Sequence, residues 1–277
     1  MKFGFVTCVE LGLSCMQAIY DVGGALDLIV TLPDDKARAK SGRVYLDAFC
    51  GAHAVPLLKS PNVNDVAVIN AIRQSGIDWL FIIGWSQIAR ADVLAAPGRG
   101  VLGMHPTLLP IGRGRAAIPW AILKRLGKTG VTLFKLDGGV DTGDIVAQRV
   151  IPLTASTTAT ELYNAVNEHH IALMQETFLQ LVNDSIIAVP QDNATATEWP
   201  GRKPEDGEID LSGSVHVAEC LVRAVTRPYP GAFVVRDGIT MIVWKAEIGQ
   251  SDAMARANDL VFHDGVLRCV DWTLVEG

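Results

Sequence analysis

The sequence has few features of a disulfide-stabilised or zinc-binding protein. Its 277 residues include only five cysteines, an odd number, and no Cys-x-x-Cys pair occurs among Cys8, Cys15, Cys50, Cys220 and Cys269. This pattern indicates neither a disulfide framework nor a zinc site. We therefore expect reduced thiols and no bound metal.

Long hydrophobic runs are also missing. Apolar runs such as Trp79–Ile83 have the length of a strand, well short of the roughly 20 residues that a transmembrane helix needs. The run from Met1 to Val6 resembles a strand and lacks the cleavage pattern of a signal peptide. We therefore expect a cytoplasmic protein without a membrane partner.

The chain has no dense run of Lys or Arg, and its formal net charge is −6. An acidic balance argues against the large basic surface that binds nucleic acid, so a small-molecule partner is expected instead. The hydrophobic content of 49% is ample for a core. The length suits one large domain with a smaller appendage.

The segment from Gly103 to Gln148 is the most informative part of the sequence. The apolar run Val101–Met104 follows a turn that contains Pro and Gly, which predicts a strand with His105 at its carboxyl end. Pro106 and Pro110 keep the next residues extended. Ligands bind at the carboxyl ends of strands in open parallel sheets, so His105 is a candidate site residue.

A carboxylate follows in a Gly-rich turn. We predict a helix over Ile118–Leu126 and a second strand over Thr129–Leu136, which brings the ends of two neighbouring strands, and hence His105 and Asp141, together. A histidine can take up and release a proton near neutral pH, and an adjacent carboxylate orients it and favours its cation. On spacing alone, a loop histidine and a turn-forming aspartate are the commoner outcome.

Three short motifs lie close together in this segment. They are His-Pro-Thr-Leu-Leu-Pro from His105, the Gly-Arg-Gly that follows it, and Val-Asp-Thr-Gly-Asp-Ile from Val140. Together they resemble the signature of formyltransferases that use 10-formyltetrahydrofolate, over about residues 75 to 150. The catalytic group of that family is an Asn, a His two residues later and a distant Asp, which implies catalytic roles for His105 and Asp141.

Gly103 stands where the family has its asparagine. The amide of that asparagine polarises the formyl oxygen, and losing one such donor typically costs roughly two to three orders of magnitude in rate. Protonated His105, a backbone N–H or a bound water could supply the missing donor. Otherwise the enzyme is slow, or the fold has kept the ligand and lost the chemistry.

The resemblance also implies a folate site. In the resembled family, the segment after the strand Trp79–Ile83 supplies much of the pterin pocket, largely through backbone groups. Folate contacts are therefore expected from Trp85, Gln87, Ile88, Val140 and Asp141. A place in the core is an equal alternative for Ile88.

Substrate contacts are expected near the histidine and near the amino terminus. Arg113 and Arg115 could fork onto a phosphate or carboxylate of the acceptor, and Thr107 lies in the histidine motif. The stretch Leu11–Ile19 resembles, in degraded form, the phosphate-cradling loop of the purine-pathway formyltransferases, which implies phosphate contacts from Gly12 and Ser14. A simple cap, with Ser14 beginning a helix to Tyr20, is the alternative.

The last third of the chain predicts a separate module. A long helix over Ala159–Leu181, with His169 and His170 expected at the surface, closes the first domain. A turn-rich linker, a helix over Val215–Val225 and short alternating runs follow, as in a small β barrel or sheet. We therefore expect an N-terminal formyltransferase domain over 1–185 and a C-terminal helix with a small β module over 186–277.

Two motifs in the C-terminal third narrow the resemblance to particular groups of formyltransferases. Pro-Glu-Asp-Gly-x-Ile-Asp from Pro204, and Arg-Pro-Tyr-Pro-Gly-Ala-Phe from Arg227, resemble the C-terminal part of formyltransferases that act on nucleotide-linked amino sugars, and they recur in the tRNA enzymes. The implied fold is α/β, with a Rossmann-like parallel sheet. Because such a module can form a dimer interface in that family, a homodimer is also expected.

The resemblance implies an N-formyltransferase that moves a formyl group from 10-formyltetrahydrofolate to a primary amine. The acceptor implied is a nucleotide-linked 4-amino-4,6-dideoxy sugar for surface polysaccharide, such as lipopolysaccharide O-antigen. An ornithine-type or peptide amine is an alternative acceptor. The other alternative is a folate-binding protein with weak or no activity because of Gly103.

Overall fold

The computed structural model describes residues 1–36, 38, 42–236, 238–249 and 256–276. Contacts divide the chain into two compact units whose segments alternate along the sequence. The N-terminal unit comprises Met1–Gly114, Gly130–Ile151 and Val166–Glu198, and the C-terminal unit comprises Arg115–Thr129, Pro152–Ala165 and Trp199–Gly277. The single domain boundary near residue 185 stays a prediction.

The N-terminal unit is built on a mixed, mainly parallel sheet. The described part of this sheet has seven strands in the order β3-β2-β1-β4-β5-β7-β8. Strands β1 to β5 run parallel to one another. The strand bounds are β1 Phe3–Val6, β2 Leu28–Thr31, β3 Leu57–Lys59, β4 Trp79–Ile82, β5 Gly100–His105, β7 Lys128–Lys135 and β8 Ile145–Pro152.

The fold is α/β as predicted, but β7 runs antiparallel to β5. His105 pairs with Thr132 in the middle of β7, and the end of that strand, Lys135, pairs with Leu102. The prediction that two neighbouring strands end side by side at the site is therefore wrong. Asp141 reaches the end of β5 because the loop after β7 turns back toward it.

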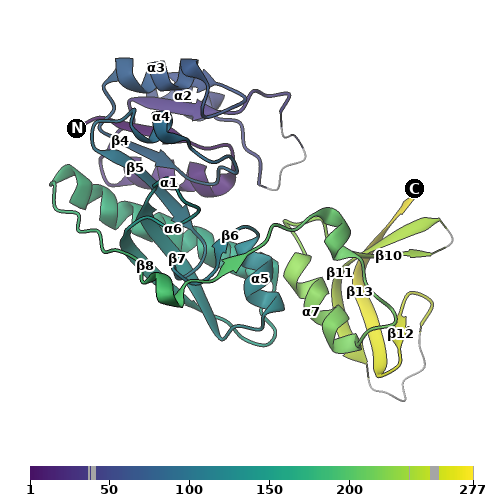
Figure 1. The fold of residues 1–277 in the computed structure, drawn as a ribbon. Helices are drawn as coiled ribbons and strands as arrows, with labels where there is room; N and C mark the ends of the chain where they lie inside the picture. The colour runs from purple at the N-terminus through teal and green to yellow at the C-terminus, as the bar shows by residue number, and fades with distance from the viewer. Residues whose placement is uncertain (37, 39–41, 237, 250–255, 277) are drawn as a thin grey trace. The chain divides into compact units, whose positions relative to one another are not determined.

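Helices cover both faces of this sheet, as Figure 1 shows for α3 on one side and α1 on the other. On the first face, Ile69 and Ile72 of α3 belong to a core with Val30 and Ile82 of the sheet. Burial of each such side chain contributes about 1.5–3 kcal/mol. The helices are α1 Glu10–Asp21, α2 Asp47–His53, α3 Val66–Ser75, α4 Ala91–Leu94 and α6 Ala159–Val182.

Aromatic side chains fill the second face. Phe3 of β1 lies 4.7 Å from Phe178 of α6 between ring centroids, and Phe5 lies 5.6 Å from Phe81 of β4. Phe3 and Phe5 point to one face of β1 and Val6 to the other, as the two-residue period of a strand requires. The long predicted helix over Ala159–Leu181 is confirmed by α6.

Helix α1 begins earlier than predicted. Its first residue is Glu10, so Gly12 and Ser14 lie inside the helix. The prediction of a loop at these positions and of a cap at Ser14 is therefore wrong, whereas phosphate contacts of Gly12 and Ser14 stay a prediction. A Cβ at position 12 would come within 1.9 Å of Thr7 Oγ1, so the glycine is explained by the close approach of the helix to the end of β1.

The C-terminal unit holds a four-stranded antiparallel sheet among its described residues, in the order β10-β11-β13-β12. Its strands are β10 Ala232–Arg236, β11 Ile239–Gly249, β12 Leu260–Phe262 and β13 Gly265–Glu276, and its helices are α5 Ala117–Leu123 and α7 Val215–Val225. The predicted helix over Val215–Val225 and the small β module are confirmed. Helix α5 is shorter than predicted, and Arg125 beyond its end has a left-handed φ of 50°.

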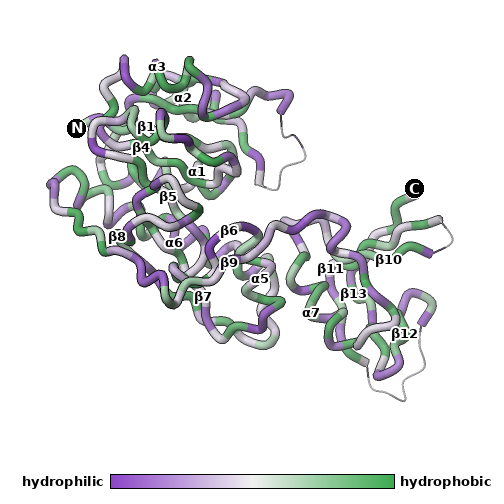
Figure 2. Tube along the Cα trace, viewed as in Figure 1, coloured by the Kyte–Doolittle hydropathy of each residue, from purple (hydrophilic) through white to green (hydrophobic). Residues whose placement is uncertain are grey.

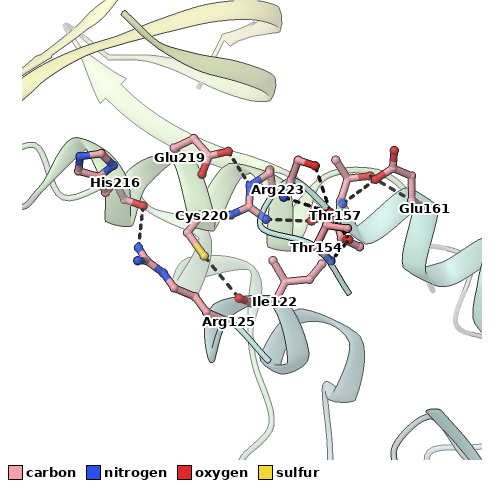
Figure 3. A network of polar contacts seen from close by, with 11 residues as sticks. Ile122, Arg125, Thr154, Thr157, Glu161, His216, Glu219, Cys220 and Arg223 are labelled. Carbon is pink, nitrogen blue, oxygen red and sulfur yellow. Dashed lines mark hydrogen bonds and ion pairs between the residues drawn. The ribbon is translucent and has the colours of Figure 1, made fainter. Parts of the chain in front are cut away.

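Polar contacts join α5, the segment before α6, and α7 (Figure 3). Arg223 donates to Glu219 and to the carbonyl of Thr157, and Arg125 donates to the carbonyl of His216. These residues border a cavity of about 370 Å³ within the C-terminal unit. Because Glu219 compensates the charge of Arg223, the network stabilises the packing of α7.

The hydropathy of the helices is that of surface helices packed on a sheet. Figure 2 shows hydrophilic and hydrophobic residues alternating along α3. Over the described residues, no helix combines the length and hydropathy needed to cross a membrane. The remaining elements are the strands β6 Arg113–Gly114 and β9 Glu198–Trp199 and the 3-10 helices Asn193–Thr195 and Pro204–Gly207.

Candidate active site

His105 is the last residue of β5 and is only 7% exposed. Its Nε2 lies 2.7 Å from the carbonyl oxygen of Gly112, and its Nδ1 lies 3.5 Å from Oδ2 of Asp141. Both ring nitrogens therefore face acceptors. A doubly protonated imidazole donates from both nitrogens, whereas a neutral one donates from a single nitrogen.

Asp141 completes this pair from the loop between β7 and β8. Its backbone has a left-handed φ of 53°, a conformation that aspartate tolerates better than most residues. Oδ2 accepts a hydrogen bond of 2.8 Å from the backbone N–H of Gly114. The structure thus brings together the two residues that the sequence predicted as a pair, and Gly114 fixes the carboxylate between its own N–H and the ring.

Gln191 supports the pair, and the sequence analysis missed it. Its Nε2 donates to the carbonyls of Asp141 at 2.8 Å and Gly143 at 2.7 Å. Its Oε1 accepts from Nε and Nη2 of Arg113 at 3.1 and 2.8 Å. Gln191 lies in a turn-rich linker without periodicity, so the sequence gives no signal for its role.

The three residues near His105 that were predicted to contact the substrate differ in their contacts within the protein. Arg113 also donates to Asn193, so its guanidinium is already bonded within the protein. Arg115 lies in the C-terminal unit, where its backbone N–H donates to Trp199. Thr107 is 1% exposed, and its hydroxyl has no hydrogen-bond partner in the described part of the chain. Substrate roles for these residues stay predictions.

The loop after β4 carries the predicted folate residues. Gln87 Oε1 accepts from Trp85 Nε1 and from the backbone N–H of Val63, and its Nε2 donates to the carbonyl of Pro61. The side chain of Gln87 therefore holds two loops together. Ile88 is 65% exposed, so the alternative that places it in the core is wrong.

Val140 is the predicted folate residue on the other loop. Its apolar side chain is 42% exposed, next to Asp141 in the turn between β7 and β8. The parallel strands β4 and β5 end at the same edge of the sheet, and the loop with Val140 folds back to that edge. Exposed apolar side chains on both loops provide surface that a planar heterocycle can cover.

His170 of α6 is a second buried histidine. It is 1% exposed, so the prediction that placed it at the surface is wrong. Val166 and Met174, one helical turn to either side, are also buried, so this face of α6 packs inward. Burial lowers the pKa of His170 to about 4; a hydrogen bond to the carbonyl of Val166 opposes this shift, and the nearby charge of His105 adds to it.

A family model described as formyl transferase matches residues 26–178, more than half of the chain. The chain belongs to the formyl transferase family. A second model, described as formyl transferase, C-terminal domain, matches residues 202–267. The chain is accordingly a transferase, and formyl transfer is its reaction.

Individual formyltransferases are similar over nearly the whole chain. The methionyl-tRNA formyltransferase of Ruminiclostridium cellulolyticum is 30% identical over 247 residues, which cover 88% of this chain and 79% of that protein. Two crystal structures share the fold. WlaRD, a sugar 3N-formyl transferase in the presence of dTDP and 5-N-formyl-THF, has a TM-score of 0.72, 16% identity and 98% coverage of both chains. The N-formyltransferase from Helicobacter canadensis, in complex with folinic acid and dTDP-3-aminofucose, has a TM-score of 0.70, 15% identity and coverage of 97% and 99%.

Proposed function

We propose that this formyltransferase moves a formyl group from 10-formyltetrahydrofolate to the primary amine of a nucleotide-linked amino sugar destined for surface polysaccharide. The observation that carries the proposal is the pair formed by the buried His105 at the end of β5 and the partly buried Asp141 of the returning loop, with Nδ1 3.5 Å from Oδ2. The two structures with the same fold support the sugar acceptor, because each was solved with dTDP or a dTDP-sugar and a folate derivative.

The chemistry of the pair follows from its surroundings. His105 takes the proton that the attacking amine gives up at Nε2, where the substrate takes the place of the Gly112 carbonyl, and Asp141 at Nδ1 stabilises the cation that forms. The protonated Nε2 then donates a hydrogen bond toward the formyl oxygen, where negative charge develops, and finally gives its proton to N10 of the leaving tetrahydrofolate as the bond between carbon and N10 breaks. Preorganised donors of this kind act strongly in a buried site because they need no reorientation.

The loops at this edge suit the proposed cofactor. 10-Formyltetrahydrofolate supplies the activated formyl group. Ile88 and Val140 expose apolar side chains on the two loops, and the partly buried Trp85 packs against the core. We assign Ile88 and Val140 to apolar contact with the pterin. Gln87 contributes by fixing the loop, since both ends of its amide are bonded within the protein.

A methionyl-tRNA acceptor is the second candidate, because a relative of that activity is 30% identical. The formal net charge of −6 and the sequence pI near 5.5 favour the small acceptor, since a tRNA requires a basic surface to neutralise its phosphates.

An assay of tetrahydrofolate release separates these acceptors. It uses 10-formyltetrahydrofolate with dTDP-, GDP- and UDP-linked amino sugars, with ornithine, and with charged methionyl-tRNA. We expect release to depend on one nucleotide sugar. Release with methionyl-tRNA or ornithine alone would overturn the sugar acceptor, and folate binding without turnover on any acceptor would show that the chemistry has been lost with the asparagine.

A further inference from the structure

The linker segment 189–197 crosses both loops of the active site within the N-terminal unit. On the side of the histidine, Thr197 accepts from Gly112 through its hydroxyl at 2.9 Å and from Arg113 through its carbonyl at 2.9 Å. On the side of the carboxylate, Val189 and Ile145 exchange two backbone hydrogen bonds of 2.8 Å. The linker is therefore bonded to the segments that follow His105 and Asp141 in the chain.

Gln191 lies where the linker meets the loop of Asp141. Its amide nitrogen donates to the carbonyl of Asp141, the residue with the left-handed φ, and to the carbonyl of Gly143 two residues later. Its oxygen is held by the Arg113 guanidinium, which also donates to Asn193. The amide oxygen is thus held by the charged Arg113, and the amide nitrogen holds the loop of Asp141.

Resting on the proposed function, we infer that Gln191 is a positioning residue for formyl transfer, which acts through Asp141 and does not touch the substrate. By holding the carbonyls of Asp141 and Gly143, it keeps the turn in the conformation that aims the carboxylate at Gly114 N–H and at His105. Arg113 anchors Gln191 and has a role inside the protein. The linker therefore sets the distance between base and partner.

The Gly114 amide reports the position of the carboxylate directly. Its N–H donates to Asp141 Oδ2, so its hydrogen exchange is slow only while the carboxylate stays in place. This measurement needs neither substrate nor turnover. A linker that merely stabilised the fold would change exchange throughout the unit, whereas a positioning residue changes it at Gly114 and in the turn after Asp141.

Two substitutions distinguish the contacts of the amide oxygen from those of the amide nitrogen. Gln191→Met removes the contact with Arg113 and the contacts with the loop, whereas Gln191→Glu keeps an acceptor for Arg113 and loses only the donors to the loop. We expect both to lower kcat on the order of tenfold to 100-fold with little change in KM, and to speed exchange at Gly114, because small misplacements of catalytic groups are costly. Gln180→Met, an exposed position on α6, is the matched control and leaves both readouts unchanged.

A double-mutant cycle tests whether Gln191 acts through Asp141. In an Asp141→Asn background, Gln191→Met should cost no further activity. Additive losses, or unchanged Gly114 exchange in Gln191→Met, would overturn the inference. If Gln191→Met does not fold, Gln191→Asn, which shortens the amide by one methylene, takes its place. If the wild type turns over no acceptor, the proposed function fails, while the Gly114 exchange still decides the inference.

Discussion

Leu136 fills the space beside Gly103. A Cβ at position 103 would lie 2.7 Å from Leu136 Cδ2 and 3.3 Å from its Cγ, in the middle of the pairing between β5 and β7. The family motif has an amide donor at this place, and here the neighbouring side chain is apolar. The structure therefore gives the formyl oxygen no amide donor from position 103, which leaves His105 as the side-chain donor we propose.

Restoring the amide tests this arrangement. The contact is with the flexible end of Leu136, and Gly103 has an ordinary strand backbone, so Gly103→Asn combined with Leu136→Ala should fold. We expect the double variant to exceed Leu136→Ala in kcat by about tenfold or more, because one oxyanion donor is worth roughly two to three orders of magnitude at most. A double variant slower than Leu136→Ala would show that the site is shaped around glycine.

Removing the histidine should abolish most turnover. We expect His105→Asn to lower kcat by roughly 10²–10⁴-fold, the usual contribution of general acid–base catalysis. His263→Asn, an exposed histidine in the turn between β12 and β13, serves as the control and keeps full activity. Undiminished turnover in His105→Asn would refute the assignment of the catalytic pair.

Stability should depend on pH through His170. Its pKa is lowered from 6.5 to about 4 in the folded state, so the unfolded chain binds the proton first as the pH falls. The free energy of unfolding is therefore highest above about pH 6.5, where His170 is neutral in both states. It falls progressively toward pH 4, by up to about 3 kcal/mol. Urea unfolding across this range should show a weaker pH dependence in His170→Gln than in the wild type, and His263→Asn should retain the wild-type dependence.

Two glycine-to-alanine substitutions should have opposite effects on the stability of the fold. Gly12→Ala places a Cβ within 1.9 Å of the buried Thr7 Oγ1, so we expect destabilisation of about 1–3 kcal/mol. Gly51 lies inside α2 with nothing within 4 Å of its Cβ position, and Gly51→Ala should stabilise by up to about 1 kcal/mol. Thermal unfolding of the two variants checks this, and equal effects would contradict the close packing of α1 on Thr7.

The folate contact of Ile88 can be tested without disturbing the core. Because Ile88 is 65% exposed, Ile88→Ser should leave the melting temperature unchanged and weaken folate binding by about tenfold, the loss of one apolar contact. Val66→Ser, at a position of α3 that is 71% exposed, is the matched control. Calorimetric titration with 5-formyltetrahydrofolate measures both, and equal affinities in Ile88→Ser and the wild type would remove Ile88 from the site.

Much of the local structure could be predicted from the sequence. The run before His105 is a strand that ends at the histidine, and the segments over Val215–Val225 and Ala159–Leu181 are helices, because hydrophobic periodicity is set by each segment's own residues. The homodimer, the domain boundary and the substrate residues stay predictions.

The errors arose where a pattern was short or where a side chain's environment depends on distant segments. Gly12 and Ser14 were predicted to lie in a phosphate loop, with a cap at Ser14 as the alternative, but α1 begins one turn before Ser14. Gly12 lies where this helix closely approaches Thr7. His170 was expected at the surface, since the residue is polar and its neighbour is a second histidine. Its burial depends on how α6 lies against the sheet.

The sequence by itself determined the family, the pair of His105 and Asp141 and the order of the elements, because these depend on motifs and on periods within one segment. Only the tertiary structure decided that β7 runs antiparallel to β5, that a returning loop delivers Asp141, and that Gln191 and Arg113 hold it there. The physical reason is that strand direction and long-range hydrogen bonds are fixed by the packing of segments far apart in the chain, and no local pattern of residues records them.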